Sequence, residues 1–566
     1  MTSRDQIIAT LTAAGGPFEL ETFTDDQGLP LLRYATGPQT LRELLEATRQ
    51  FGDRPFLVFE DERISYEDHF RRVAALAHWL EALGVGKGDR VAIGMRNYPE
   101  WAIAFFACQA VGAVAVLLNA WWTGAELVYG LTDSGARVAL LDDERYARLL
   151  PHLAEVQGVS MLVTRDTTRR YDVPAWEDAL ASFAATTELP ALNLGAEDYA
   201  TILYTSGTTG VPKGALHTHR NHLTNIHNAL LSGAVAAAMA AANAPAQTSP
   251  ADAEAPQPSS LQTFPFFHIG GISGLYVSAI TGSKLVLMYK WDVEQAFDLI
   301  GREQIRGWSG VPTVVRELLE HPRAAGGELA SLASIASGGA PVPEDLIQRV
   351  GSLFQTRVSP GNGYGATETT SAIISNGGAD YLARPSSVGR PTVTVAVRIV
   401  TEGGADAADG EIGEIWLKGP NIFAGYWNKP AETAAAFSDG WFRTGDLGYR
   451  DAEGFYYVVD RKKDVIIRGG ENVYCAEVER VLHHHPDIVD VALIGLPHRA
   501  LGEEVAAVIE PRPGARLTEA DVQAWVAGRL ARFNVPTKVF FIDEPLPRTA
   551  TGKVLKRELK QRYAGS

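Results

Sequence analysis

The sequence of 566 residues contains only two cysteines, Cys108 and Cys475, which are too few for a disulfide framework or a cysteine-based metal site. It also has no excess of basic residues, because 51 Lys and Arg stand against 67 Asp and Glu, a formal net charge of −16. Nucleic-acid binding requires a basic surface, so this balance excludes that class but allows a small anionic ligand in a local basic pocket. With 46% hydrophobic and 21% charged residues, overall disorder is excluded as well.

One uncharged hydrophobic run, residues 101–122, is long enough to span a bilayer. However, its periodicity changes at Gly112, and Lys and Arg clusters are missing from its flanks. These features favour a buried helix that ends near Gly112, followed by a buried strand over residues 113–118. The N-terminal residues show no charged segment before an apolar core, so we expect no secretory signal, no transmembrane segment and a cytoplasmic protein.

Apolar helical stretches alternate with short strand-like runs from about residue 40 to 200, which is typical of layered α/β architecture. Predicted elements include a helix over residues 73–83 and strands over residues 90–94 and 137–141. The pattern becomes β-rich after about residue 377, and the last hundred residues predict a small α+β unit. We therefore expect α/β and α+β architecture, with packed α/β sheets and a β-rich subdomain in residues 1–460 and a small mobile domain in residues 461–566. The Ala-, Pro- and Ser-rich residues 231–260 predict a helix end that runs into a solvated loop.

The segment YTSGTTGVPKG, residues 204–214, follows a strand-like run and predicts a phosphate-binding loop. Its glycines allow tight turns in which successive N–H groups face one anion. Hydroxyl groups and one lysine add donors that suit a di- or triphosphate. The segment is not a Walker A loop, because Pro212 precedes Lys213 and Gly214 follows it. The candidate phosphate ligands are Thr205, Ser206, Gly207, Thr208, Thr209 and Lys213.

This loop resembles that of the adenylate-forming superfamily, in particular its acyl-CoA synthetase branch. Further motifs of that superfamily follow in order: SGGAP (337–341), NGYGATET (362–369), TGD (444–446), DRKKD (460–464), GGENVYCA (469–476) and PRTATGK (547–553). The resemblance extends from about residue 41 to 557. It implies an N-terminal adenylation domain that binds ATP and the acyl group, and a C-terminal lid domain with a hinge near Lys463.

The resemblance also assigns residues to the nucleotide. Gly339, Ala340, Pro341, Tyr364 and Gly365 would surround the adenine. The carboxylate of Asp446 would accept hydrogen bonds from the ribose hydroxyls, and Arg461 would contact ribose or phosphate.

Four residues are assigned to catalysis by the resemblance. Lys553 would place a positive charge between the substrate carboxylate and the α-phosphate, where negative charge develops. Glu368 would hold Mg²⁺, Thr367 would lie near the α-phosphate, and His268 would line the acyl or thiol path. A satisfied core histidine is the alternative interpretation of His268. Gly469, Gly470 and Glu471 would line the path of CoA in the second half-reaction.

The implied function is that of an ATP-dependent acid–thiol ligase. A carboxylic acid and MgATP would give acyl-AMP and pyrophosphate, and the acyl group would then pass to CoA. The apolar residues Phe266, Phe267, Ile269 and Ile272 favour a fatty acid. An aryl-acid CoA ligase and a stand-alone adenylating enzyme with another acceptor are the alternatives. A monomer and a homodimer both remain open.

Peptide-synthetase adenylation domains, luciferase-like oxygenases and non-enzymatic relatives are less favoured. The segment 264–271 has no acid to hold a substrate ammonium group. A non-enzymatic relative would be expected to lose Lys553, Glu368 or Asp446, and all three are present.

Overall fold

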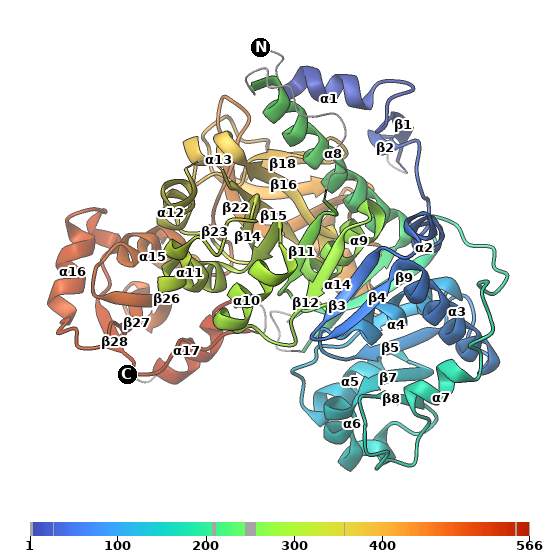
Figure 1. Cartoon of the computed structure of the whole chain (residues 1–566). Helices are drawn as coiled ribbons and strands as arrows, with labels where there is room; N and C mark the ends of the chain where they lie inside the picture. The colour runs from blue at the N-terminus through green and yellow to red at the C-terminus, as the bar shows by residue number, and fades with distance from the viewer. Residues whose placement is uncertain are drawn as a thin grey trace.

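The computed structural model describes residues 4–25, 28–205, 211–243, 256–355, 357–549 and 552–564. Two large sheets with helices between and around them form the body, and a small C-terminal unit lies to one side (Figure 1). The helices are α1 (Arg4–Thr12), α2 (Leu41–Thr48), α3 (Tyr66–Ala82), α4 (Pro99–Ala110), α5 (Gly124–Ser134), α6 (Asp143–Leu149), α7 (Trp176–Ala181), α8 (His219–Asn243), α9 (Ile269–Thr281), α10 (Val293–Glu303), α11 (Pro312–Glu320), α12 (Glu344–Phe354), α13 (Gly378–Ala383), α14 (Pro430–Ala436), α15 (Cys475–His483), α16 (Glu519–Ala527) and α17 (Lys556–Tyr563).

The first large sheet has the strand order β20-β10-β9-β6-β5-β7-β8. Its strands β9, β6, β5, β7 and β8 run parallel to one another. Strand β10 pairs antiparallel with β9, and β20 pairs antiparallel with β10. The bounds are β5 (Arg90–Gly94), β6 (Val114–Leu117), β7 (Val138–Asp142), β8 (Ser160–Thr164), β9 (Tyr199–Thr205), β10 (Lys213–Thr218) and β20 (Gly425–Tyr426).

The second large sheet has the order β17-β16-β15-β14-β13-β11-β12-β3-β4, parallel from β15 to β3. The bounds are β3 (Pro55–Phe59), β4 (Glu62–Ser65), β11 (Ser259–Gln262), β12 (Lys284–Leu287), β13 (Gly307–Gly310), β14 (Ser334–Gly338), β15 (Ser359–Ala366), β16 (Ser371–Gly377) and β17 (Arg390–Pro391). The largest core cluster joins both sheets through α2, α3, α4 and α9. This arrangement is the predicted packing of α/β sheets.

The β-rich subdomain is an antiparallel sheet, and a fourth sheet forms the C-terminal unit. The subdomain contains β18 (Ala396–Val400), β19 (Gly413–Lys418), β21 (Phe437–Ser438), β22 (Trp441–Arg450) and β23 (Tyr456–Arg461). The C-terminal sheet contains β24 (Ile466–Arg468), β25 (Glu471–Val473), β26 (Ile488–His498), β27 (Gly502–Pro511) and β28 (Lys538–Phe541). The chain therefore changes sheets between Arg461 and Ile466, next to the predicted domain boundary. A separate hairpin, β1 (Leu20–Thr24) and β2 (Pro30–Tyr34), follows α1.

The hydrophobic run at residues 101–122 lies in the protein core. It forms most of α4, a turn and β6, and every residue of β6 is buried. Gly112 makes the turn with a φ of +70°, a conformation that glycine adopts without strain. The prediction of a buried helix and strand is therefore confirmed. Across the ranges described above, no helix is both long and apolar enough to cross a membrane.

Several predicted elements differ in their bounds from the observed ones; the strand predicted over residues 137–141, for example, is observed as Val138–Asp142. The helix predicted over residues 73–83 begins earlier, at Tyr66, because the Ser65 side chain caps it by accepting a hydrogen bond from the Asp68 N–H at 3.1 Å. The predicted loop at the end of residues 231–260 is wrong at Ser259 and Ser260, which belong to β11 between two parallel neighbours. The part of that tract at residues 244–255 lies outside the described residues.

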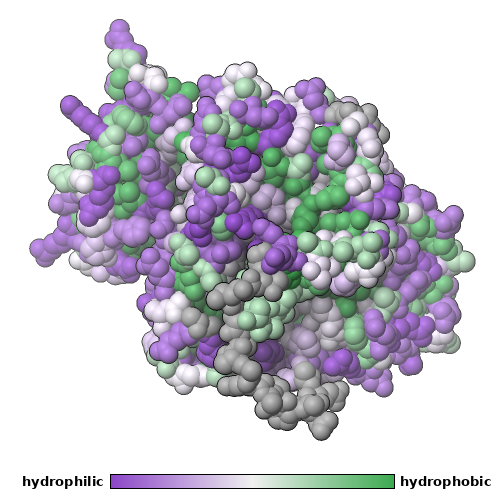
Figure 2. Space-filling view, turned by 90° about the horizontal axis from the view of Figure 1, so that it is seen from above, coloured by the Kyte–Doolittle hydropathy of each residue, from purple (hydrophilic) through white to green (hydrophobic). Residues whose placement is uncertain are grey.

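The molecular surface mixes polar and apolar residues. Seen from above, hydrophilic residues cover much of this face, and hydrophobic residues appear between them as separate patches (Figure 2).

Candidate active site

The strands on either side of the candidate phosphate loop form an antiparallel pair. Thr205 ends β9 and lies opposite Lys213, the first residue of β10, and the Thr205 hydroxyl donates to the Lys213 carbonyl oxygen at 3.4 Å. The pairing brings these two predicted ligands together at the base of the loop. Ser206, Gly207, Thr208 and Thr209 lie outside the described residues.

A second predicted motif forms a tight turn beside this strand pair. Thr367 and Glu368 begin a single 3-10 turn, Thr367–Thr369, directly after β15. Gly365 precedes it, and a β-carbon there would lie 2.0 Å from the Ser371 carbonyl oxygen, so the close approach of β15 and β16 requires glycine. The Tyr426 hydroxyl donates to Glu368 Oε1 at 2.8 Å.

Tyr426 connects the two motifs, and the sequence analysis missed it. Lys213 Nζ lies 5.1 Å from the centre of the Tyr426 ring, whose hydroxyl binds Glu368. Because Tyr426 lies in the short strand β20 that pairs with β10, its position depends on strand pairing between distant segments. A sequence signal for this role is absent.

The predicted ribose ligands form a compact group around one carboxylate. Asp446 on β22 lies opposite Arg461 on β23, and Arg461 Nε is 3.3 Å from Asp446 Oδ1. The Tyr364 hydroxyl donates to Asp446 Oδ2 at 2.7 Å. Both oxygens of this nearly buried carboxylate are therefore engaged by other predicted site residues. Burial, together with the Asp446 charge, raises the pKa of Tyr364 well above its usual value.

Lys553 reaches this same group from the C-terminal unit. Burial, together with the positive charges of Arg461 and Lys463, lowers the pKa of Lys553 to about 8, against the opposing effect of Asp446. The adjacent Gly552 lies against the body, since a β-carbon there would be 3.3 Å from Val311 Cγ2. The loop that carries Lys553 is therefore docked on the N-terminal region.

The candidate CoA-path residues are not part of this group. Gly469 and Gly470 form the two-residue turn of the β24–β25 hairpin, in which Arg468 pairs with Glu471. Both glycines have positive φ, 61° and 91°, as this tight kind of turn requires. Gly469, Gly470 and Glu471 are all exposed. The structure thus brings Lys553 within electrostatic reach of Asp446 and Arg461, and leaves the Gly470 hairpin exposed.

The predicted adenine loop and His268 meet at Phe264. A β-carbon on Gly339 would lie 3.7 Å from the Phe264 ring, and the His268 ring stacks on Phe264 with centres 6.2 Å apart. Ala340 is half-buried and Pro341 is exposed. His268 Nδ1 accepts a hydrogen bond from the Gly270 N–H at 3.1 Å at the start of α9, and burial lowers its pKa to about 4.

The apolar residues expected to line an acyl pocket are core residues. Phe266, Phe267, Ile269 and Ile272 are buried in the largest core cluster, with 8% of the surface exposed at most. Phe266 stacks on Trp101 with centres 4.9 Å apart. These residues therefore take part in core packing, and a fatty acid as the substrate stays a prediction.

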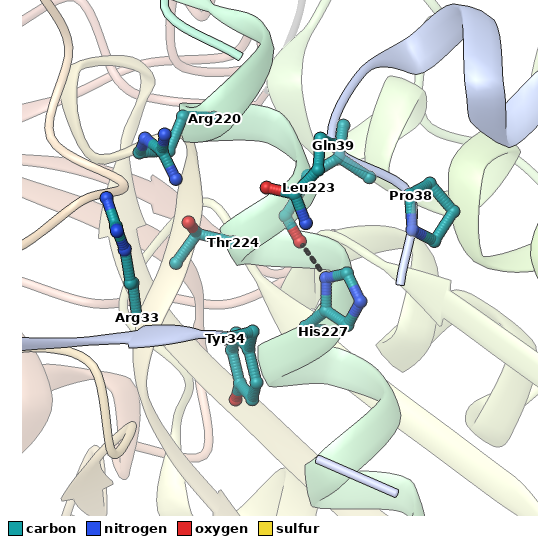
Figure 3. Close-up of a pocket in the computed structure, with 8 residues that line it drawn as sticks. All are labelled: Arg33, Tyr34, Pro38, Gln39, Arg220, Leu223, Thr224 and His227. Carbon is teal, nitrogen blue, oxygen red and sulfur yellow. Dashed lines mark hydrogen bonds between the residues drawn. The ribbon is translucent and has the colours of Figure 1, made fainter. Parts of the chain in front are cut away.

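A small surface pocket lies elsewhere, between β2 and α8 (Figure 3). In it the Tyr34 ring stacks on His227 with centres 4.9 Å apart, and His227 Nδ1 donates to the Leu223 carbonyl oxygen at 2.8 Å. None of its lining residues is a predicted site residue. The residues that line it are Arg33, Tyr34, Pro38, Gln39, Arg220, Leu223, Thr224 and His227.

The profile of the AMP-binding enzyme family matches residues 44–427, and that of the AMP-binding enzyme C-terminal domain matches residues 477–553. The chain belongs to the AMP-binding enzyme family. This AMP-binding enzyme is 36% identical over 501 residues to a feruloyl-CoA synthase of an Amycolatopsis species, covering 88% of this chain and 94% of that protein. It is 32% identical over 549 residues to a long-chain-fatty-acid–CoA ligase of Bacillus subtilis, covering 92% and 94% respectively.

Solved structures match this AMP-binding enzyme over most of its length. ATP-bound MatB from Rhodopseudomonas palustris matches with a TM-score of 0.80 and 30% identity, covering 92% of this chain and 99% of MatB. The apo structure of the same protein gives a TM-score of 0.72, with 31% identity and coverage of 93% and 99%. The TM-score is thus higher against the ATP-bound structure of MatB than against its apo structure.

Proposed function

We propose that this AMP-binding enzyme joins a carboxylic acid to CoA in two steps at one site, with acyl-AMP as the intermediate. It is an AMP-forming acid–thiol ligase. ATP and the acid would give acyl-AMP and pyrophosphate, and the CoA thiol would then displace AMP. The observation that carries the proposal is the meeting of Lys553 with Asp446 and Arg461.

The first step would depend on charge placed by Lys553. Asp446 and Arg461 would hold the ribose end of the nucleotide, and Lys213 with the loop after Thr205 would hold the phosphates. The Lys553 ammonium, docked beside Asp446, would stabilise the negative charge that develops as the carboxylate oxygen attacks the α-phosphorus. The positive charges of Arg461 and Lys463 also favour an anionic ligand in this place.

The residues around Glu368 fit a magnesium ion. Tyr426 occupies Oε1, and among the described residues no hydrogen bond or ion pair reaches Oε2. Mg²⁺ prefers one or two carboxylates together with substrate phosphates, and Lys213 places the phosphate loop on the other side of Tyr426. When bound there with ATP, the ion would supply charge neutralisation at the phosphates.

The second step would require the small domain to turn. The proposed domains are residues 1–460 and 461–566, with the hinge at exposed Lys463 between β23 and β24. In the observed arrangement the Gly470 hairpin is exposed, and rotation would exchange the Lys553 loop for this hairpin.

Two classes of carboxylic acid are candidates for the substrate, aryl acids and fatty acids. The similarity to a feruloyl-CoA synthase supports an aryl acid, and that to a long-chain-fatty-acid–CoA ligase supports a fatty acid. The higher identity to the feruloyl-CoA synthase leads us to place aryl acids first.

The test separates the two half-reactions. ATP–pyrophosphate exchange is measured with a panel of straight-chain and aromatic acids, and thioester formation is measured from supplied acyl-adenylate and CoA. We expect Lys553→Met to reduce exchange by about 100-fold or more and to leave thioester formation intact. Lys560→Met, at a half-buried lysine of α17 that lies 4.0 Å from Glu503, is the matched control and should change neither rate. Equal loss of both half-reactions in Lys553→Met would contradict the proposal, and exchange without any thioester would indicate another acceptor.

A further inference from the structure

Four buried polar side chains form a chain of hydrogen bonds. None of the four is a predicted site residue, but the chain ends on the backbone of one, Thr367. The Tyr276 hydroxyl on α9 lies 3.2 Å from His222 Nδ1 on α8. On the other side of the same ring, His222 Nε2 lies 2.8 Å from the Thr201 hydroxyl on β9. The Thr201 hydroxyl lies 3.4 Å from His217 Nδ1 on β10. His217 Nε2 ends the chain at 2.7 Å from the backbone carbonyl oxygen of Thr367.

All four side chains have essentially no exposed surface. Burial lowers the pKa of His217 to about 4, and it lowers the pKa of His222 well below its usual value. Both imidazoles are therefore neutral at physiological pH, and each carries one ring proton. Buried polar groups need hydrogen-bond partners. In each imidazole, therefore, the ring proton must be on the nitrogen that faces an acceptor, and the other nitrogen must accept a hydrogen bond.

The carbonyl end sets the direction of every hydrogen bond. A carbonyl oxygen only accepts, so His217 carries its proton on Nε2 and its Nδ1 must accept from the Thr201 hydroxyl. The Thr201 oxygen is then the acceptor for His222 Nε2–H, which leaves His222 Nδ1 to accept from Tyr276. The four bonds thus point one way, from α9 to the turn that carries Thr367 and Glu368.

The receiving turn also has hydrogen bonds of its own. The Thr370 N–H donates to the Thr367 carbonyl oxygen at 3.0 Å, and Asn421 Nδ2 donates to the Thr369 carbonyl oxygen at 3.1 Å. The Phe423 N–H donates to the Glu368 carbonyl oxygen at 2.9 Å, and Tyr426 donates to the Glu368 carboxylate. The Thr367 carbonyl oxygen therefore accepts two hydrogen bonds, one from Thr370 within the turn and one from His217, which ties the start of the turn to β10. A change in the hydrogen-bond chain would therefore alter the direction in which Thr367 and Glu368 point.

We propose that Tyr276, His222, Thr201 and His217 form a one-directional hydrogen-bond relay that positions the Thr367–Glu368 turn for MgATP. These four are positioning residues, since they reach the nucleotide only through the turn. The relay couples α9, which begins at His268, to the turn. Its link to MgATP rests on the proposed function, whereas its geometry does not.

The direction of the relay can be measured without catalysis. Nitrogen-15 spectra of the histidine-labelled protein are expected to show the Nε2–H tautomer for both His217 and His222, with no titration between pH 5 and 9. The variants His217→Gln and His222→Gln assign the signals. An Nδ1–H tautomer at either histidine would overturn the proposed direction.

The positioning role is measured as MgATP affinity by calorimetry. Tyr276→Phe and Thr201→Val remove members of the relay, and each should weaken MgATP binding about fivefold, the effect of a typical hydrogen bond. Thr201→Ser keeps the hydroxyl and should restore most of the affinity. Tyr66→Phe is the matched control, because this equally buried tyrosine donates to the Ser278 carbonyl oxygen of the same helix at 2.7 Å without joining the relay.

The outcomes separate the two proposals. If Tyr276→Phe binds MgATP as Tyr66→Phe does, or if Thr201→Ser weakens binding as much as Thr201→Val, the positioning role is refuted. A wild-type chain that does not bind MgATP at all would refute the proposed function and the positioning role together, whereas the tautomers would still decide the direction of the relay.

Discussion

The docked position of Lys553 makes a quantitative prediction about the pH dependence of acyl-adenylate formation. Burial, with Arg461 and Lys463 nearby, brings the pKa of Lys553 from 10.5 to about 8. This difference of about 2.5 pKa units corresponds to about 3 kcal/mol of destabilisation of the charged form. The ammonium needed for the first half-reaction is therefore lost in an accessible pH range.

Because the pKa is lowered in the protein without nucleotide, the effect should appear in kcat/KM for MgATP. This ratio reports the free enzyme, and it should fall about tenfold per pH unit above pH 8, or about 100-fold by pH 10. The bound triphosphate favours the ammonium, so kcat alone should begin to fall at a higher pH. Pyrophosphate exchange at subsaturating and saturating MgATP separates the two parameters.

Lys553→Arg is the matched variant for this pH profile, because a guanidinium remains charged throughout the range. It should be slower than the wild type near neutral pH, but its kcat/KM should lack the fall above pH 8. The reasoning would be refuted by a wild-type profile that stays flat to pH 10, or by the same fall in Lys553→Arg.

Two further predictions concern stability, each measured by chemical or thermal denaturation. Asp460, buried at the end of β23, has its pKa raised from 3.8 to about 6, so its ionisation in the folded state costs stability as pH rises from about 4 to 6. Asp460→Asn should thus stabilise the fold by up to about 3 kcal/mol above pH 6 and by nothing below pH 4; a gain independent of pH would contradict this. Gly365→Ala should destabilise by about 2 kcal/mol or more, because its β-carbon would lie 2.0 Å from the Ser371 carbonyl oxygen. Gly377→Ala, whose nearest contact would be 3.6 Å, is the control in the paired strand and should be tolerated, and equal losses in the two variants would oppose the steric argument.

Local signals predicted much of the fold. The strand over residues 90–94 is observed with the same bounds as β5, because a short β-branched and apolar run between turn residues has few other ways to bury itself. The hydrophobic run at residues 101–122 was interpreted correctly from the glycine that interrupts it. Helix ends were less accurate, as the early start of α3 at Tyr66 shows, because side-chain caps lie outside the hydrophobic pattern.

The family and the candidate site residues also follow from the sequence, because its glycine-rich and charged motifs occur in a fixed order. The distances between these motifs do not follow from it. Glu368 and Tyr426 are separated by 58 positions, and Thr201 and Tyr276 belong to different elements on either side of α8. Such neighbours are set by strand pairing and helix packing, which a local pattern does not encode.

The sequence by itself determined which chemical groups this AMP-binding enzyme possesses, whereas the tertiary structure decided what surrounds each of them. Phe266 and Phe267 show the difference, since their apolar character follows from the sequence, whereas their place in the largest core cluster comes only from packing. Lys553 shows it again, since its lowered pKa arises from burial and from charges about 90 positions away in the sequence, at Arg461 and Lys463. The direction of the relay from Tyr276 to Thr367 is likewise fixed only where the four elements meet.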